Sequence, residues 1–257
     1  MSDTVVITRP RAQAEALAQR VAQAGRTAVV LPLLEIHPLP DQSQLRETLA
    51  QLDRFALAAF VSPNAVDAAF AHIGRWPAGV AVAVVGEGSR AALARHGVTP
   101  ATATIHCPPD PAFSDSEHLL ASLDLAALHG REVLIVRGET GRELMADALR
   151  AAGARVTTVA AYRRSIPELT PELAAQLRTL LGGEHQWVVT SSEALRGLAG
   201  LVQRLGPGDN FVAKLQRQHF VVPHARIEQT ARELGLDQVT LTGSGDEGVF
   251  AALQSQV

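Results

Sequence analysis

The sequence is poor in cysteine, in excess charge and in long apolar runs, and each shortage excludes a class of protein. Cys107 is the only cysteine among 257 residues, so neither an intrachain disulfide nor a multi-cysteine metal site can form. The 23 basic and 26 acidic residues leave a net charge of -3, which argues against sequence-independent nucleic-acid binding. No apolar run approaches the roughly 20 residues that cross a bilayer.

The chain start and the histidine pattern support the same picture of a cytoplasmic protein without a metal. The N-terminus lacks the apolar segment of a signal peptide, so we expect no membrane contact. The nine histidines include no pair at metal-ligand spacing on one helix, which predicts no metal site. Cys107 precedes Pro108 and Pro109, a context that favours a structural cysteine over a catalytic one.

The chain repeats itself. The pattern of residues 131–167 recurs without a gap in the first forty residues, and both copies read as strand, helix, strand. Gly25 and Gly153 suit the left-handed position that ends each helix, so each copy predicts a βαβ unit. The matched positions are Val133, Ile135, Arg137, Glu143, Ala146, Ala152 and Gly153 with Val5, Ile7, Arg9, Glu15, Ala18, Ala24 and Gly25.

Other segments pair in the same way, each as a strand followed by a helix. The pairs are 55–70 with 185–202, 80–98 with 219–236, and 101–123 with 238–253. About five alternating strands per half predict two similar, doubly wound parallel-sheet α/β domains of flavodoxin-like type. The proline-studded segments 32–40 and 161–171 are predicted to be two linkers between these domains.

Ligands of such sheets bind beyond the carboxyl ends of the strands. The loops there are rich in hydroxyls, glycines and arginines, a combination that binds anions at helix starts. They are 8–10, 62–64, 86–89, 137–139, 190–192, 223–226 and 242–245. The sequence 243–248 also fits G-x-G-x-x-G, but the chain ends too soon for the second strand and acidic residue of a dinucleotide site.

Several loop residues have two interpretations. Arg9 and Arg137 can each bind a ligand carboxylate. Alternatively, Arg9 can pair with Glu15 and Arg137 with Glu143. Gly138 follows Arg137 directly and belongs to the same candidate site. The hydroxyls of Ser62, Ser191 and Ser192 can bind substrate or cap helices. Tyr162, the only tyrosine, lies in the second predicted linker, where it can offer a phenol to a ligand or pack at a domain junction.

Seven motifs in order resemble the uroporphyrinogen-III synthase family over nearly the whole chain. They are VVITRP, FVSPNAV, VVGEGSRAAL, DSEHLL, VLIVRGETGRELMADALRAAGARV with AAYRR, VVTSSEAL and LTGSGDEG. The resemblance implies interleaved domains, 1–35 with 168–257 and 36–167. It also implies a cofactor-free enzyme acting on hydroxymethylbilane, a linear tetrapyrrole with an acetate and a propionate on every ring. Loss of the terminal hydroxyl as water gives an azafulvene cation, and a spiro intermediate then leads to closure with the last ring inverted.

The resemblance also carries residue roles. Tyr162 matches a tyrosine near the family's cleft, where its phenol would hydrogen-bond the departing hydroxyl. Further substrate contacts carry over to Ser62, Asn64, Gly86, Ser89, Thr190, Ser191 and Ser192. Where the first half has Gly-Glu-Gly-Ser, the second has Pro-His-Ala-Arg, so Arg226 or backbone N–H groups are expected to hold a carboxylate there.

Two rival functions fit a pair of α/β domains. One is a non-enzymatic protein that binds small anions, and the other is a sugar-nucleotide transferase, for which the chain shows no nucleotide pocket. The expected partner is the small substrate alone, without nucleic acid or membrane. We expect a monomer, and a transient contact with the enzyme that supplies the substrate stays open.

Overall fold

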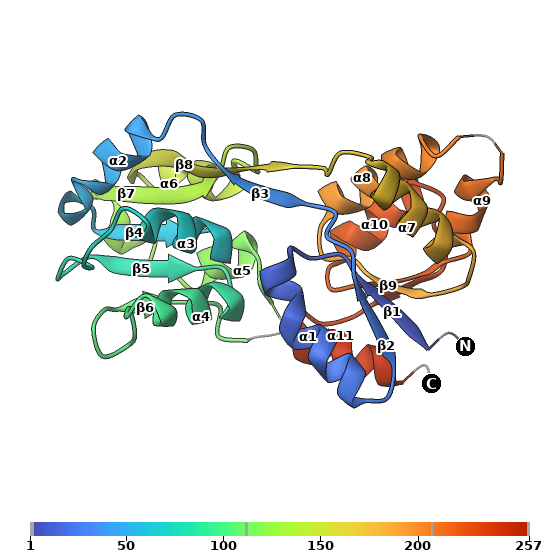
Figure 1. Ribbon diagram of the computed structural model, residues 1–257. Coiled ribbons are helices and arrows are strands. Elements are labelled where there is room, and N and C mark those ends of the chain that lie inside the picture. The colour runs from blue at the N-terminus through green and yellow to red at the C-terminus, as the bar shows by residue number, and fades with distance from the viewer. Residues whose placement is uncertain (1–2, 111–112, 207, 256–257) are drawn as a thin grey trace. The chain divides into compact units, whose positions relative to one another are not determined.

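The computed structural model describes residues 3–110, 113–206 and 208–255. The chain divides into two compact units, of which unit 1 comprises Met1–Glu35 with Ser165–Val257, and unit 2 comprises Ile36–Arg164 (Figure 1). Within the described ranges, no helix is both long and apolar enough to cross a membrane.

Unit 1 is built on a five-stranded sheet of order β11-β10-β9-β1-β2, in which every neighbouring pair is parallel. Counted along the unit, this order is 2-1-3-4-5, the flavodoxin-like arrangement. The strands are β1 (Thr4–Ile7), β2 (Thr27–Val30), β9 (Gln186–Val188), β10 (His219–Val222) and β11 (Val239–Leu241).

Helices cover both faces of this sheet because alternate strand residues point to opposite sides. Val5 and Ile7 pack with α1 (Arg11–Gln23) and α11 (Gly245–Gln254). Val6 and its neighbours Trp187 and Phe220 face the opposite helices. Those helices are α7 (Pro171–Leu181), α8 (Ser192–Gln203), α9 (Phe211–Gln216) and α10 (Ala225–Glu233).

Unit 2 places its repeat-related strands in the same spatial order, although β7 and β8 come last along this unit, and it adds β3 at one edge to give β3-β8-β7-β4-β5-β6. Its strands are β3 (Glu35–Pro38), β4 (Leu57–Phe60), β5 (Ala81–Val84), β6 (Ile105–His106), β7 (Glu132–Gly138) and β8 (Arg155–Ser165). One face packs α2 (Ser43–Leu49), α3 (Pro63–Phe70) and α4 (Glu87–Arg95). The other packs α5 (Ser116–Ala121) and α6 (Leu144–Ala151), and short 3-10 turns span Leu52–Arg54 and Ala126–Leu128.

The expected α/β fold with parallel sheets is confirmed, as are the left-handed glycines Gly25 (φ 80°) and Gly153 (φ 87°). The expectation that Tyr162 lies in a linker is wrong, because β8 continues to Ser165 and pairs Tyr162 with Gly138. The proline-rich segment 32–40 likewise contains an edge strand, β3, a position where the missing N–H of Pro38 is tolerated. The sequence pattern did not predict helices α2, α7 and α9, although α2 and α7 correspond to each other because the offset of the repeat places Pro171 on Ser43.

Candidate functional site

In each unit the helices change sides between two neighbouring strands. The helix after β1 covers one face of the unit 1 sheet and the helix after β9 covers the other. In unit 2 the same change occurs between β7, followed by α6, and β4, followed by α3. Such a switch opens a crevice at the carboxyl ends of the two strands, where α/β proteins bind ligands. The expected site residues there are Arg9, Thr190 and Ser191 in unit 1, and Ser62, Arg137 and Gly138 in unit 2.

Tyr162 lies beside the switch in unit 2. Its ring belongs to the hydrophobic core and the residue is 4% exposed, whereas its phenol oxygen lies 3.0 Å from Ser62 Oγ. A β-carbon on Gly138 would lie 3.1 Å from Tyr162 Cζ, so the missing side chain gives the ring its room. The fold therefore holds the phenol at the carboxyl edge, next to the start of α3.

Both switch-point arginines are engaged in ion pairs inside their own units. Arg137 Nη1 lies 2.7 Å from Glu143 Oε1. Glu143 is the partner that the sequence predicts for an Arg137 that is not bound to substrate. Arg9 pairs with Asp246 in the first turn of α11, so the expected pairing with Glu15 is wrong. Asp246 was missed because it comes from the far end of the chain, and only the sheet order β11-β10-β9-β1 brings α11 beside α1.

The switch-point serines cap helices. Ser62 Oγ accepts from Ala65 N at 3.1 Å, and Ser191 Oγ accepts from Ala194 N at 3.4 Å. Ser192 is not a cap, and its Oγ accepts a hydrogen bond from buried Thr230 at 3.0 Å. The half-buried Thr190 hydroxyl has no hydrogen-bond partner within the described ranges, so it is available to a ligand. Asn64 is half-buried at the second position of α3.

The start of α4 forms a second part of the unit 2 edge. Gly86 is the residue before this helix, and any side chain there would collide with Ser114. Ser89, three residues later, is 2% exposed, and its Oγ is buried without a hydrogen-bond partner among the described residues. A buried hydroxyl without a partner is costly in a folded protein, so its persistence suggests a ligand.

The loops after β10 and β11 meet at the unit 1 edge. His224 precedes α10, and its Nδ1 lies 3.4 Å from Ser244 Oγ in the next loop, a contact that sequence reasoning missed. Arg226 is exposed in the first turn of α10. The glycines of 243–248 have a local explanation, because a β-carbon on Gly248 would lie 2.7 Å from the carbonyl oxygen of Gly243.

The loop after β7 is fastened at several points. Arg137 Nη1 donates to the carbonyl oxygen of Arg142 at 3.1 Å, and Arg164 donates to Thr140 at 3.2 Å. Arg142 pairs with Glu117 of α5, and this hydrogen bond lowers the pKa of the Glu117 carboxyl. The backbone beside Tyr162 is therefore held in one position.

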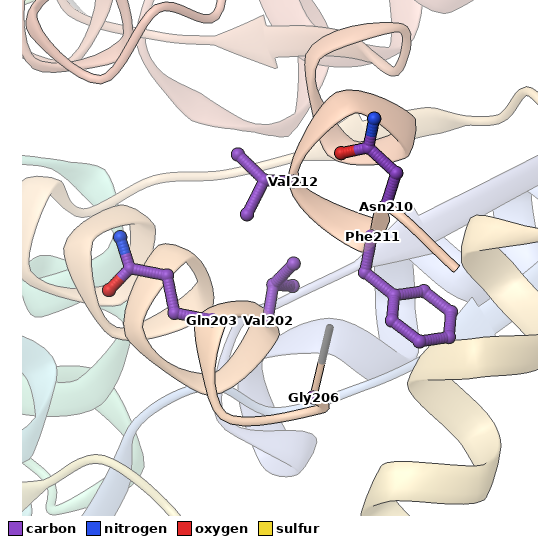
Figure 2. A pocket seen from close by; sticks show the side chains of 6 residues that line it. All are labelled: Val202, Gln203, Gly206, Asn210, Phe211 and Val212. Carbon is purple, nitrogen blue, oxygen red and sulfur yellow. The ribbon is translucent and has the colours of Figure 1, made fainter. Parts of the chain in front are cut away.

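A separate cavity of about 550 Å³ lies in unit 1, where Val202 and Gln203 of α8 face the chain around Phe211 (Figure 2). The C-terminal end of a helix that follows a parallel strand lies at the amino edge of the sheet, away from the hydroxyl-rich loops. None of the residues that line this cavity is charged, so the cavity offers a polyanion no cationic side chain.

Neither a metal cluster nor a reactive thiol is found in the part of the chain that the structure describes. No group of three His, Cys, Asp or Glu side chains suits a metal ion among those residues. Burial raises the pKa of the Cys107 thiol, which disfavours the nucleophilic thiolate.

The sequence matches the family described as uroporphyrinogen-III synthase HemD over residues 15–243. A uroporphyrinogen-III synthase of Salmonella typhimurium is 32% identical over 98% of this chain and 100% of the relative. Its counterpart in Escherichia coli is 30% identical with the same coverage.

Two solved structures share the fold. A mutant uroporphyrinogen III synthase from the extremely thermophilic bacterium Thermus thermophilus superposes with a TM-score of 0.59 at 17% identity, covering 98% of this chain and 97% of that one. The uroporphyrinogen-III synthetase of Helicobacter pylori gives 0.60 at 13% identity, covering 100% of both chains.

Proposed function

The chain belongs to the uroporphyrinogen-III synthase family, and we propose that its carboxyl-edge loops hold the substrate carboxylates while Tyr162 assists departure of the hydroxyl. The enzyme is a cyclising lyase of tetrapyrrole biosynthesis that converts hydroxymethylbilane to uroporphyrinogen III with loss of water. The full-length similarity to synthases carries this conclusion, and it leaves neither rival function with a supporting observation.

The chemistry explains why few acids and bases are needed. The substrate closes unaided to the isomer without ring inversion, so the enzyme's main task is to restrain it in the conformation that leads to inversion. Well-placed reactants lower a barrier by about 7–11 kcal/mol, more than a single general acid usually supplies. Several fixed donors are therefore more useful than one strong catalyst.

The hydroxyls of Thr190 and Ser89 are the best-supported carboxylate donors. Neither has a hydrogen-bond partner in the described part of the chain, and each lies at the carboxyl edge of its sheet beside a helix start. We propose backbone N–H contacts at Gly86, Gly138 and Ser192, and side-chain contacts from Asn64, Ser191 and Arg226. Because Arg9 and Arg137 are already paired with carboxylates inside their own units, their proposed role is to fix the carboxyl-edge loops around the substrate.

The decisive experiment measures product identity. The purified protein is incubated with freshly generated hydroxymethylbilane, the products are oxidised to porphyrins, and isomers I and III are separated by chromatography. A synthase gives isomer III in excess over the spontaneous isomer I. Formation of isomer I alone, at the uncatalysed rate, would refute the function.

Substitutions of the two hydroxyls test the proposed contacts. Thr190→Val and Ser89→Ala should each raise KM by about 10- to 100-fold, the effect of losing one hydrogen bond to a charged group. Ser89→Ala removes a buried, unsatisfied group, so its folding stability should not fall. Thr179→Val, at an exposed position of α7, is the control. Unchanged KM in both variants would remove these residues from the site.

We further propose that the chain acts as a cytoplasmic monomer. Its single cysteine suits a reducing compartment. Light scattering coupled to size-exclusion chromatography should give about the 27.2 kDa of one chain, and cell fractionation should recover the protein with the cytosol. A stable dimer in solution would contradict the proposed monomeric state.

A further inference from the structure

Ser62 makes two hydrogen bonds, and only one of them is explained by its helix. Its Oγ accepts from the backbone N–H of Ala65 at 3.1 Å, the usual bond of a helix-capping serine. The same oxygen lies 3.0 Å from the phenol oxygen of Tyr162, which is 100 residues away in the chain. Capping α3 does not require this second contact.

The internal repeat supplies a comparison within the same molecule. Ser191 caps α8 in unit 1 as Ser62 caps α3 in unit 2. The offset that places Arg137 on Arg9 also places Tyr162 on Leu34 and Gly138 on Pro10. The capping serine is thus present in both units, whereas the tyrosine and the glycine that admits its ring occur in unit 2 alone. The hydrogen bond between Ser62 and Tyr162 is therefore a feature of unit 2 that unit 1 lacks.

Counting protons gives the bond a direction. A serine hydroxyl has one proton and two lone pairs, and one lone pair of Ser62 is taken by the Ala65 N–H. Within the described ranges, the phenol oxygen of Tyr162 is the only acceptor near the Ser62 proton, and Ser62 Oγ is the only hydrogen-bond partner of the phenol. If Ser62 donates to Tyr162, the serine hydroxyl both accepts a hydrogen bond, from Ala65, and donates one, to the phenol oxygen. The phenol then keeps its own proton for a hydrogen bond to a ligand.

From this we infer that Ser62 is a positioning residue whose hydroxyl donates to the Tyr162 phenol oxygen and directs the phenol proton toward the hydroxyl that leaves the substrate. This inference rests on the proposed role of Tyr162. When the substrate C–O bond breaks, the phenol proton moves to the departing oxygen and water leaves. The Ser62 hydrogen bond stabilises the resulting phenolate, which recovers a proton when the last ring loses one after closure. Protons therefore balance over the cycle.

Kinetics of single and double variants test the inference. Ser62→Ala should lower kcat about tenfold while KM stays within about twofold, because the lost interaction strengthens in the transition state. Ser62→Thr keeps the hydroxyl and should restore kcat. Adding Ser62→Ala to Tyr162→Phe should lower kcat no further, because residues that act as a unit are not additive. Thr170→Ala, which removes the equivalent cap from α7, controls for lost helix stability.

A spectroscopic measurement observes the contact without activity. Tyr162 is the only tyrosine, so labelling tyrosine with carbon-13 at Cζ gives a single NMR signal from this phenol. The signal should shift in Ser62→Ala, return in Ser62→Thr, and stay in place in Thr170→Ala.

The outcomes separate the two hypotheses. If Tyr162→Phe keeps the wild-type kcat, the proposed role of Tyr162 fails and this inference falls with it. If Tyr162→Phe is slow but Ser62→Ala is not, Tyr162 keeps its role and only the inference about Ser62 is overturned. A raised KM with unchanged kcat in Ser62→Ala would instead make Ser62 a substrate contact.

Discussion

At the residue scale, the important groups at the carboxyl edges are divided between those already bonded and those still available. Ser62, Arg9 and Arg137 are bonded within their own units, whereas the hydroxyls of Thr190 and Ser89 have no partner in the described ranges. A site that binds a polyanion needs both bonded and available side chains. The bonded residues fix the shape of the loops, and the available hydroxyls replace the water that a carboxylate loses on binding.

Gly138 tests how closely Tyr162 is held. In Gly138→Ala the new β-carbon would meet the Tyr162 ring at 3.1 Å, so the ring must move by a few tenths of an ångström. We expect kcat to fall and the free energy of unfolding to drop by about 1–2 kcal/mol from overpacking. Steady-state kinetics and urea unfolding measure the two effects.

Gly200→Ala is the matched control for that substitution. Gly200 lies inside α8 with open space around its α-carbon, so alanine there should raise stability by about 0.5–1 kcal/mol without changing kcat. A Gly138→Ala enzyme with wild-type kcat would show that Tyr162 tolerates displacement.

At the element scale, two half-buried histidines lie in or next to strands of the unit 1 sheet, and one of them links two neighbouring strands. His219 of β10 bonds through Nε2 to Thr240 Oγ1 of β11 at 2.9 Å. Burial lowers the pKa of His219, and burial also lowers the pKa of His185, which lies just before β9. Both imidazoles therefore resist protonation in the folded sheet.

This predicts that the protein loses stability on mild acidification. The folded-state pKa of His219 is below the ordinary value of 6.5, so the unfolded chain binds more protons as pH falls through 6.5. The free energy of unfolding, measured in urea, should be lower at about pH 5.5 than at about pH 7.5, on either side of that ordinary value. His219→Gln should reduce this difference.

Thr240→Val is the control for the histidine. It removes the same hydrogen bond but keeps the imidazole, so it should lower stability at both pH values. An undiminished pH effect in His219→Gln would assign the effect to other groups.

At the scale of the whole molecule, each unit has a complete core of its own. The two hydrophobic clusters of unit 2 draw only on residues between Ile36 and Tyr162, and those of unit 1 only on the two segments that form it. The chain thus contains one continuous unit inserted into another.

We predict that residues 36–165 fold alone when expressed as a fragment. The fragment keeps both faces of its sheet covered, so it should unfold cooperatively in urea and show a mixed helix and strand circular dichroism spectrum. It should not form uroporphyrinogen III, because the unit 1 loops are missing. A fragment that exposes apolar surface to dye or aggregates would contradict the independence of its core.

The sequence by itself determined the local units of this protein. Alternating apolar strands, helical spacing and the terminal glycines Gly25 and Gly153 predict the βαβ elements, because these patterns depend on neighbours only a few residues away. The repeat and the ordered motifs also identified the family. What the pattern missed were contacts between distant segments.

Only the tertiary structure decided which side chains meet at the site. Arg9 pairs with Asp246 because the sheet order brings the two chain ends together, and Tyr162 meets Ser62 because β4 and β8 flank β7. Neither pairing leaves a periodic trace in the sequence, since a hydrogen bond between remote residues depends on strand order and register rather than on spacing along the chain.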